Sequence, residues 1–162
     1  MDILSKLRGI SLFEGLGEHT DSLLQIKDAM EDRKISAGDF VIKEGDSGNE
    51  MYILLDGTVT VQKRTIQGDQ YVVTRLSAKD GAFFGEMALV GYDVRSATVK
   101  ADTDCRLVVL TKDRFEKLAN ENFRLGFIVV HAIARRMAEQ LRRANQDMMV
   151  LFEALLSEVS GE

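Results

Sequence analysis

The chain has 162 residues, of which 45% are hydrophobic and 29% are charged, and its formal net charge is −5. This length and balance are those of one ordinary globular domain with a buried core. The negative charge argues against non-specific nucleic-acid binding by the chain as a whole, and no apolar run of about 18 residues predicts a membrane span. Cys105 is the only cysteine, which excludes an internal disulfide and a thiolate metal cage, so we expect a cytoplasmic protein.

Residues 1–31 predict short helices that pack on the rest of the domain. Ile3 and Leu7 have helical spacing, and glycines break the pattern soon afterwards. We expect a second helix to begin near Thr20 or Asp21, because either side chain can cap a helix.

Residues 32–110 have the character of a β-domain. Eight of the 13 glycines lie between Gly38 and Gly91, and they separate short runs of β-branched and aromatic residues. Many short strands at this spacing predict a jelly-roll-like β-barrel, so the expected fold class is mainly β with flanking helices. The candidate strands are 33–36, 39–43, 51–56, 58–64, 70–76, 82–84, 95–100 and 104–110. The residues expected to point inward are Tyr52, Leu54, Val59, Val61, Val73, Cys105, Leu107 and Val109.

Residues 111–162 return to helical character. Thr111 or Asp113 can cap a short helix, and a long helix is expected over about residues 122–159. Apolar residues along the long helix recur in steps of three and four, which predicts a seam that one small barrel cannot bury. We therefore expect a homodimer through residues 130–156 or an unidentified protein partner. The seam residues are Val130, Ile133, Met137, Gln140, Ala144, Met148, Leu151 and Leu155.

The segment from Phe84 to Val99 reads FGEMALVGYDVRSATV and interrupts the strand pattern. It joins a Gly-Glu pair, an apolar stretch that can form one helical turn, a short loop and Arg95. Helix-turn amide groups and a planar guanidinium suit a phosphate, whereas the carboxylate of Glu86 suits a ribose hydroxyl. Gly85 allows close approach of the backbone, since a side chain there would occupy the space of a ligand. The segment therefore predicts a site for a sugar phosphate.

The same segment supplies further phosphate ligands. We expect the amide groups of Met87 and Ala88 to be free at the start of the helical turn. Ser96 can add a hydroxyl group to the phosphate cluster. The alternative interpretation is that Glu86 and Arg95 form an ordinary ion pair that holds a surface loop. The small residues around them favour the phosphate site over that alternative.

The segment resembles the phosphate-binding cassette of the cyclic-nucleotide-binding domain family over residues 84–97. Residues 44–61, EGDSGNEMYILLDGTVTV, are also similar to two strands of that family, and the order of elements matches over nearly the whole chain. The resemblance implies a single domain over residues 1–162. It implies ribose-phosphate ligands at Gly85, Glu86, Met87, Ala88, Arg95 and Ser96. It also implies a wall for sugar and base formed by Val61, Val73, Thr74 and Phe84.

One departure from the family concerns the base. Where some family members read adenine with a Thr-Ser pair on the long helix, this chain has Gln140 followed by Leu141. Gln140, Arg143 or Asn145 could contact the base instead, and each could equally face solvent or a partner helix. Because Ser96 is typical of bacterial members that bind cAMP, we expect cAMP rather than cGMP.

The expected function is a cyclic nucleotide sensor that transmits ligand binding through its long helix. The sequence offers no set of nucleophile, base and orienting residue, and His19 and His131 form no metal-binding motif, so we expect neither enzyme activity nor a metal. The arginines of the long helix are expected to flank its seam, so direct DNA binding is not expected. Two alternatives stay open: a dimeric scaffold that has lost the ligand, and a regulatory piece of a larger channel or signalling enzyme.

Overall fold

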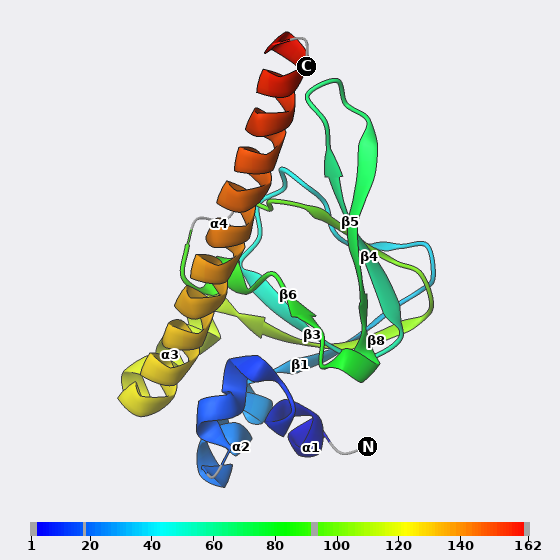
Figure 1. The fold of residues 1–162 in the computed structure, drawn as a ribbon. Coiled ribbons are helices and arrows are strands. Elements are labelled where there is room, and N and C mark those ends of the chain that lie inside the picture. Colours follow the sequence, from blue (N-terminus) through cyan, green and yellow to red (C-terminus); the bar gives the residue numbers. More distant parts are fainter. Residues whose placement is uncertain (1–2, 18, 92–93, 161–162) are drawn as a thin grey trace.

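The computed structural model describes residues 3–17, 19–91 and 94–160 of the chain. Two antiparallel four-stranded sheets are flanked by short helices at the N-terminus and by a long helix at the C-terminus (Figure 1). The helices are α1 (Ile3–Arg8), η1 (Ser11–Leu16), α2 (Thr20–Ala29), η2 (Ala78–Asp80), η3 (Glu86–Leu89), α3 (Lys112–Glu121) and α4 (Phe123–Ser160), where η marks a 3-10 helix. The strands are β1 (Glu31–Ile35), β2 (Phe40–Ile42), β3 (Glu50–Asp56), β4 (Thr58–Arg64), β5 (Gln70–Ser77), β6 (Phe83–Phe84), β7 (Thr98–Ala101) and β8 (Cys105–Thr111). The predicted mainly-β fold with flanking helices is confirmed, although the two sheets do not close into a barrel.

The sheet with strand order β1-β8-β3-β6 is covered on both faces. Alternation along β8 shows why: Cys105, Leu107 and Val109 pack between the two sheets, whereas Val108 and Leu110 pack against the helices. The inward positions predicted on β3, β4 and β8 are confirmed, because all of them lie in the core between the sheets or against it. This sheet therefore forms a rigid base beneath the cassette segment, which follows its edge strand β6.

The sheet with strand order β2-β7-β4-β5 is covered on one face only. Val59 packs inward, and Thr60 beside it lies on the outer face. At the edge strand β5 the register shifts between Val61 and Gln62, so Val73 has no partner across the strand pair and is 49% exposed. The prediction that Val73 points inward is therefore wrong.

The terminal helices pack on each other beside the first sheet. η1 contacts α4 so closely that a Cβ on Gly15 would lie 2.9 Å from Ile128 Cγ2. The predicted start of α2 is confirmed, but its N-cap residue is His19, which makes no side-chain capping bond, and not Thr20. Thr111 caps α3 as predicted, because its hydroxyl accepts a hydrogen bond from the Arg114 N–H.

The long helix α4 has one side on the domain and one side in solvent. Leu125, Val129 and Ile133 are fully buried against the N-terminal helices, so the assignment of Ile133 to a partner-facing seam is wrong. Every residue from Met137 to Val159 is exposed, and in Figure 1 this half of α4 runs in the same direction as the β4–β5 hairpin. None of the described helices has the length and hydropathy that a membrane crossing requires.

Exposed apolar side chains run along the solvent side of α4 from end to end. Their spacing follows the helical period, so they form one continuous surface, which we call the α4 stripe. The α4 stripe consists of Phe123, Phe127, Val130, Met137, Leu141, Met148, Phe152, Leu155 and Val159.

Candidate functional site

Gly85 connects β6 to the helical turn η3 and sets the direction of the cassette. Its φ of 75° is left-handed, a conformation that glycine adopts at little cost. A Cβ at this position would lie 2.9 Å from the Glu50 carbonyl oxygen and 3.2 Å from Arg95 Nη1. A side chain at position 85 would thus meet protein atoms, namely the Glu50 carbonyl group and the Arg95 guanidinium. From the sequence, such a side chain is predicted to occupy the space of a ligand instead.

Arg95 is buried at the centre of this arrangement, with only 8% of its surface exposed. Its Nη1 donates a hydrogen bond to the Glu50 carbonyl oxygen at 2.8 Å, and its guanidinium lies 5.7 Å from the centre of the Tyr52 ring. Gly48 is on the other side, where a Cβ would come within 2.3 Å of Arg95 Nε. Two glycines, a carbonyl group and an aromatic ring therefore fix the position of the guanidinium. The strand predicted to begin at Arg95 begins only at Thr98, as β7.

A polar network supports Arg95 from below. The carboxylate of Glu50 accepts two hydrogen bonds from Arg33, at 2.8 and 2.9 Å, and a third from the Tyr52 hydroxyl. The hydrogen bonds from Arg33 keep the pKa of Glu50 below its usual range. Burial, followed by the hydrogen bond to Glu50, raises the pKa of Tyr52 to about 12. Tyr52 therefore stays neutral and Glu50 stays charged across the physiological range.

The carboxylate of Glu86 pairs with Arg136 on α4 and not with Arg95. Glu86 is 6% exposed, and its Oε1 lies 3.0 Å from Arg136 Nε. The guanidinium of Arg136 also lies 4.4 Å from the centre of the Phe83 ring. The Nε–H does not point well at the carboxylate, so this buried atom has no hydrogen bond even though the two charges are adjacent. The alternative of a Glu86–Arg95 surface pair is therefore wrong, and the carboxylate is joined to the long helix.

Arg136 belongs to this candidate site by its contact with Glu86, and the sequence pattern does not assign it there because the arginines of the long helix are expected to flank the seam. A signal for it was available in the helical period. Leu125, Val129 and Ile133 are spaced by four residues, and Arg136 follows three residues later on the same side of the helix. An arginine in this position can reach an acidic side chain on the facing domain, as Arg136 reaches Glu86.

The other predicted phosphate ligands differ in how far they are exposed. Met87 and Ser96 are exposed, whereas Ala88 is buried. The Ala88 N–H donates to the Gly85 carbonyl oxygen at 3.1 Å, so the prediction that this amide is free is wrong. The reason is the tight 3-10 turn, which pairs each amide with the carbonyl three residues earlier.

The predicted wall residues face the site to different extents. Phe84 is buried and stacks on Tyr52, with 5.3 Å between ring centres. Val61 is half-buried, and its partner across the strand pair, Thr74, is exposed on the same face of the sheet. Val73 lies beside Thr74 on the exposed edge strand. These positions bring Val61 and Thr74 together, and their role as a wall stays a prediction.

The three predicted base contacts do not share one side of α4. Gln140 and Arg143 are four and seven residues after Arg136, so all three lie on one helical face. Asn145 is nine residues after Arg136, two and a half turns away, and lies on the opposite side with the α4 stripe. The structure therefore separates Asn145 from the other two, and all three are exposed.

Two hollows lie near these elements. A hollow of about 250 Å³ is lined by Phe83 and Arg136, next to the cassette. A larger hollow of about 730 Å³ on the outer face of the second sheet contains none of the predicted site residues. Within the described ranges, no three histidine, cysteine or carboxylate side chains gather as metal ligands would.

Comparison with known proteins identifies the family to which this chain is similar. The family model described as "Cyclic nucleotide-binding domain" matches residues 32–122. The chain is 37% identical over 112 residues to human cGMP-dependent protein kinase 2, covering 68% of this chain and 14% of that protein. It is 39% identical over 94 residues to the cAMP-dependent protein kinase regulatory subunit of Hypocrea atroviridis, covering 58% of this chain and 19% of that protein.

The fold agrees with the sequence match. The crystal structure of the Thermus thermophilus catabolite activator protein is similar to this chain with a TM-score of 0.75 and 27% identity. The similarity covers 87% of this chain and 62% of that chain. The curated relatives are much longer, since the chain spans less than a fifth of either kinase-related protein. The chain belongs to the cyclic-nucleotide-binding domain family.

Proposed function

We propose that this chain is a cAMP sensor that binds the ribose phosphate of its ligand at the cassette and reports binding through α4. The observation that carries the proposal is the position of Glu86. Its buried carboxylate lies one residue from Gly85, which touches Arg95, and it contacts Arg136 on the long helix. One acidic group thus connects the predicted phosphate site to the element that leaves the domain.

The chemistry of the site suits a cyclic phosphate. Arg95 is held with its fork beside the cassette, and a planar guanidinium matches the two exocyclic oxygens of such a phosphate. The carboxylate of Glu86 is acceptor-only, so it pairs naturally with a ribose 2′-hydroxyl, and Arg136 at Oε1 leaves its other oxygen for that bond. Ser96 is exposed next to Arg95 and can add a hydroxyl to the phosphate.

The choice of base depends on α4. Gln140 lies one turn beyond Arg136 on the same helical face, and its amide group offers one donor and one acceptor. The NH2 group of such an amide can donate one hydrogen bond to adenine, and its carbonyl oxygen can accept another. Relatives named for cAMP and for cGMP both match this chain, so the preference for cAMP rests on Gln140 and Ser96.

Signal transmission requires that the ligand bind two arrangements of α4 with different affinity. Arg136 is the last half-buried residue of α4 before the exposed run from Met137 to Val159, and a ligand at Glu86 competes for or reinforces its contact. The α4 stripe then offers the surface through which a second copy or another protein would sense the change. As a domain of this kind, the chain would act without enzyme activity of its own, in the cytoplasm.

Calorimetric titration tests the proposal directly. We expect wild-type protein to bind cAMP more tightly than cGMP, and Arg95→Glu to abolish binding of both, because a buried cation that faces the phosphate becomes an anion. Arg124→Glu is the matched control, since Arg124 is an exposed arginine at the first turn of α4. Equal binding of cAMP by wild type and Arg95→Glu would show that the site assignment is wrong.

A second candidate function is a dimeric scaffold that has kept the fold and lost the ligand. The exposed α4 stripe favours it, because such a surface is typical of protein interfaces. A thermal-shift screen with cAMP, cGMP and AMP separates the two functions, since a ligand far above its dissociation constant raises the melting temperature. A rise with either cyclic nucleotide and not with AMP supports the sensor, and no rise with any of them supports the scaffold.

A further inference from the structure

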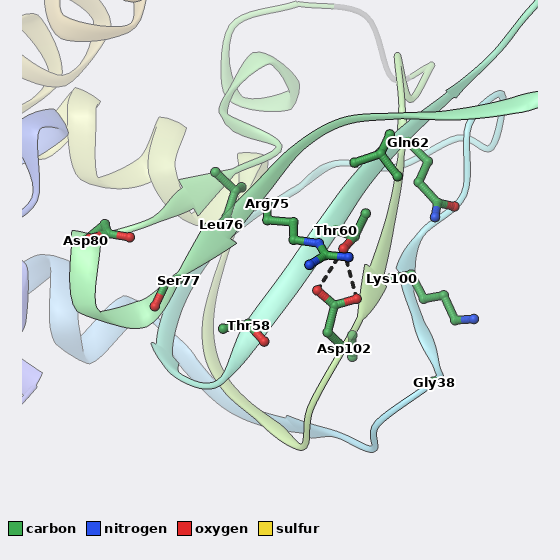
Figure 2. A pocket seen from close by; sticks show the side chains of 12 residues that line it. Gly38, Thr58, Thr60, Gln62, Arg75, Leu76, Ser77, Asp80, Lys100 and Asp102 are labelled. Atoms are coloured by element: carbon green, nitrogen blue, oxygen red, sulfur yellow. Dashed lines mark hydrogen bonds between the residues drawn. The ribbon is translucent and has the colours of Figure 1, made fainter.

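The outer face of the sheet β2-β7-β4-β5 forms a hollow of about 730 Å³. This volume is within the range of small-molecule sites, roughly 300–1,000 Å³. The hollow lies on the outer face of the sheet, and Figure 2 shows its lining side chains. None of the described cassette residues lines it, although Arg75, Leu76, Ser77 and Asp80 also line the smaller hollow beside Phe83 and Arg136.

Strand register places the lining residues in one row. Lys100 on β7 pairs with Thr60 on β4, and Thr60 pairs with Arg75 on β5, so their side chains share the outer face. On the other side of Lys100, Phe40 of β2 completes the row across the sheet. A cation thus stands on each side of a central hydroxyl group.

A fixed carboxylate lies next to this row. The Thr60 hydroxyl is 2.9 and 2.7 Å from the two oxygens of Asp102 and donates to this carboxylate, as the dashed lines in Figure 2 show. The Asp102 N–H donates in turn to the Thr58 carbonyl oxygen at 2.9 Å. Thr60 is only 4% exposed, whereas Asp102 is exposed, so a buried hydroxyl holds a carboxylate at the surface of the hollow.

The charged side chains that line this hollow form no direct ion pairs with one another. No ion pair among the described residues includes Arg75, Lys100, Asp80 or Asp102. The Lys100 ammonium lies 5.8 Å from the centre of the Phe40 ring, where Lys43 also lies, at 5.3 Å. Arg75, Lys100, Gln62 and the Asp102 carboxylate thus line one cavity.

We propose that this outer face is a second ligand site, for a small sugar phosphate. Its anionic group would bind Arg75 and, once the Lys100 side chain turns from the Phe40 ring into the hollow, Lys100 as well. Its hydroxyl groups would donate to the Asp102 carboxylate and bond to Gln62. Inorganic phosphate lacks the hydroxyl-bearing sugar that Asp102 would recognise, and a neutral sugar lacks the anion. The ligand class follows from this combination of two cations with one anchored acceptor.

The test uses the full chain, labelled with ¹⁵N, and ribose 5-phosphate as the probe. We expect saturable shifts of the Thr60, Arg75 and Lys100 amide signals at up to about 10 mM ligand, and affinity about tenfold weaker in Lys100→Ala. Lys34→Ala is the matched control, because it removes the same charge from an exposed strand of the other sheet and should bind like wild type. Repeating the titration in Arg95→Glu separates the sites, since that change disables the cassette and leaves the outer face intact.

Asp102→Asn tests the ligand class. This change keeps an oxygen for Thr60 and removes the charge, so we expect it to weaken ribose 5-phosphate and not inorganic phosphate. The dispersion of the amide signals shows whether each variant is folded. If Asp102→Asn does not fold, the comparison of wild type with Lys100→Ala still tests the site. Absence of saturable shifts at the outer face overturns the site. Equal affinity for inorganic phosphate and ribose 5-phosphate, or equal weakening by Lys34→Ala, overturns the sugar phosphate assignment.

Discussion

Removing the Arg136 side chain should destabilise the domain and weaken its ligand binding, whereas removing its neighbour Arg135 should do neither. The Arg136→Ala change leaves the buried Glu86 carboxylate without its cation and uncovers the Phe83 ring. Arg135→Ala is a close control, since it removes the same side chain one position earlier from a 3.8 Å contact with Glu14.

The magnitude follows from burial. Breaking a fully buried ion pair costs about 3–5 kcal/mol, and an exposed pair contributes about 0–1 kcal/mol. The Glu86 and Arg136 side chains are 8% and 37% exposed, so their pair lies between these limits and we expect a loss of about 2 kcal/mol for Arg136→Ala. The Arg135 and Glu14 side chains are 56% and 76% exposed, so we expect about 0.5 kcal/mol or less for Arg135→Ala.

Urea unfolding without ligand measures these losses, and a double-mutant cycle with Glu86→Gln isolates the pair. We expect the cycle to show a coupling of about 1 kcal/mol or more, well above the roughly 0.3–0.5 kcal/mol by which independent sites deviate from additivity. Calorimetry should show cAMP bound about tenfold more weakly by Arg136→Ala, because the carboxylate loses the group that orients it. Equal losses for the two arginine variants, or additive effects in the cycle, would refute the assignment of Arg136 to the site.

Three further predictions concern the glycine, the tyrosine and the long helix. Gly85→Ala should lower the free energy of unfolding in urea by roughly 2–3 kcal/mol, because of the left-handed φ and the contact with the Glu50 carbonyl group. Gly68→Ala is the control, since Gly68 has φ 96° and open space around it, and it should lower this energy by about 1 kcal/mol. Equal losses would show that the contact is unimportant. The pKa of Tyr52 is raised to about 12 from 10.0, so its contribution to stability is complete below pH 10 and is lost as pH rises towards 12, by up to roughly 2–3 kcal/mol. Tyr52→Phe should remove this alkaline loss, and an unchanged pH profile would contradict the assignment. Leu141→Glu in the α4 stripe should lower the mass measured by light scattering to that of one chain, and a wild-type mass already equal to one chain would contradict the proposed homodimer.

The strands of this fold were predictable because glycine turns separate them. The predicted range 58–64 agrees with β4, and alternation along β8 correctly separated its two faces. The orientation of Val73 was not predictable in this way, because one unpaired residue at the register shift on β5 changes which face the following side chains occupy. Local pattern therefore defined where strands lie better than it defined which edge residues are buried.

The site was predictable only within one segment of the chain. Gly85, Glu86 and Arg95 are close in sequence, and their residue types indicate phosphate and ribose chemistry without reference to the fold. The partner of Glu86 is 50 residues away, and its identity depends on how α4 packs on η1 and places Arg136 over the Phe83 ring. Apolar residues in steps of three and four form two opposite stripes along α4. Only the packing of the helix shows which stripe contacts the domain and which faces solvent.

The two stripes of α4 also limit how strongly a ligand can act. The contacts of α4 with the domain end at Arg136, and the residues beyond it up to Val159 are exposed. A ligand shifts the position of this exposed half only by the difference in its affinity for the two arrangements, and one contact through which it can act is the Glu86–Arg136 pair. A difference equal to the roughly 2 kcal/mol expected for Arg136→Ala would change the equilibrium by roughly 30-fold, and a base contact at Gln140 would add to it. That factor is enough to modulate a partner in a graded way, and a sharper response would require two chains coupled through the α4 stripe, so that two such pairs change together.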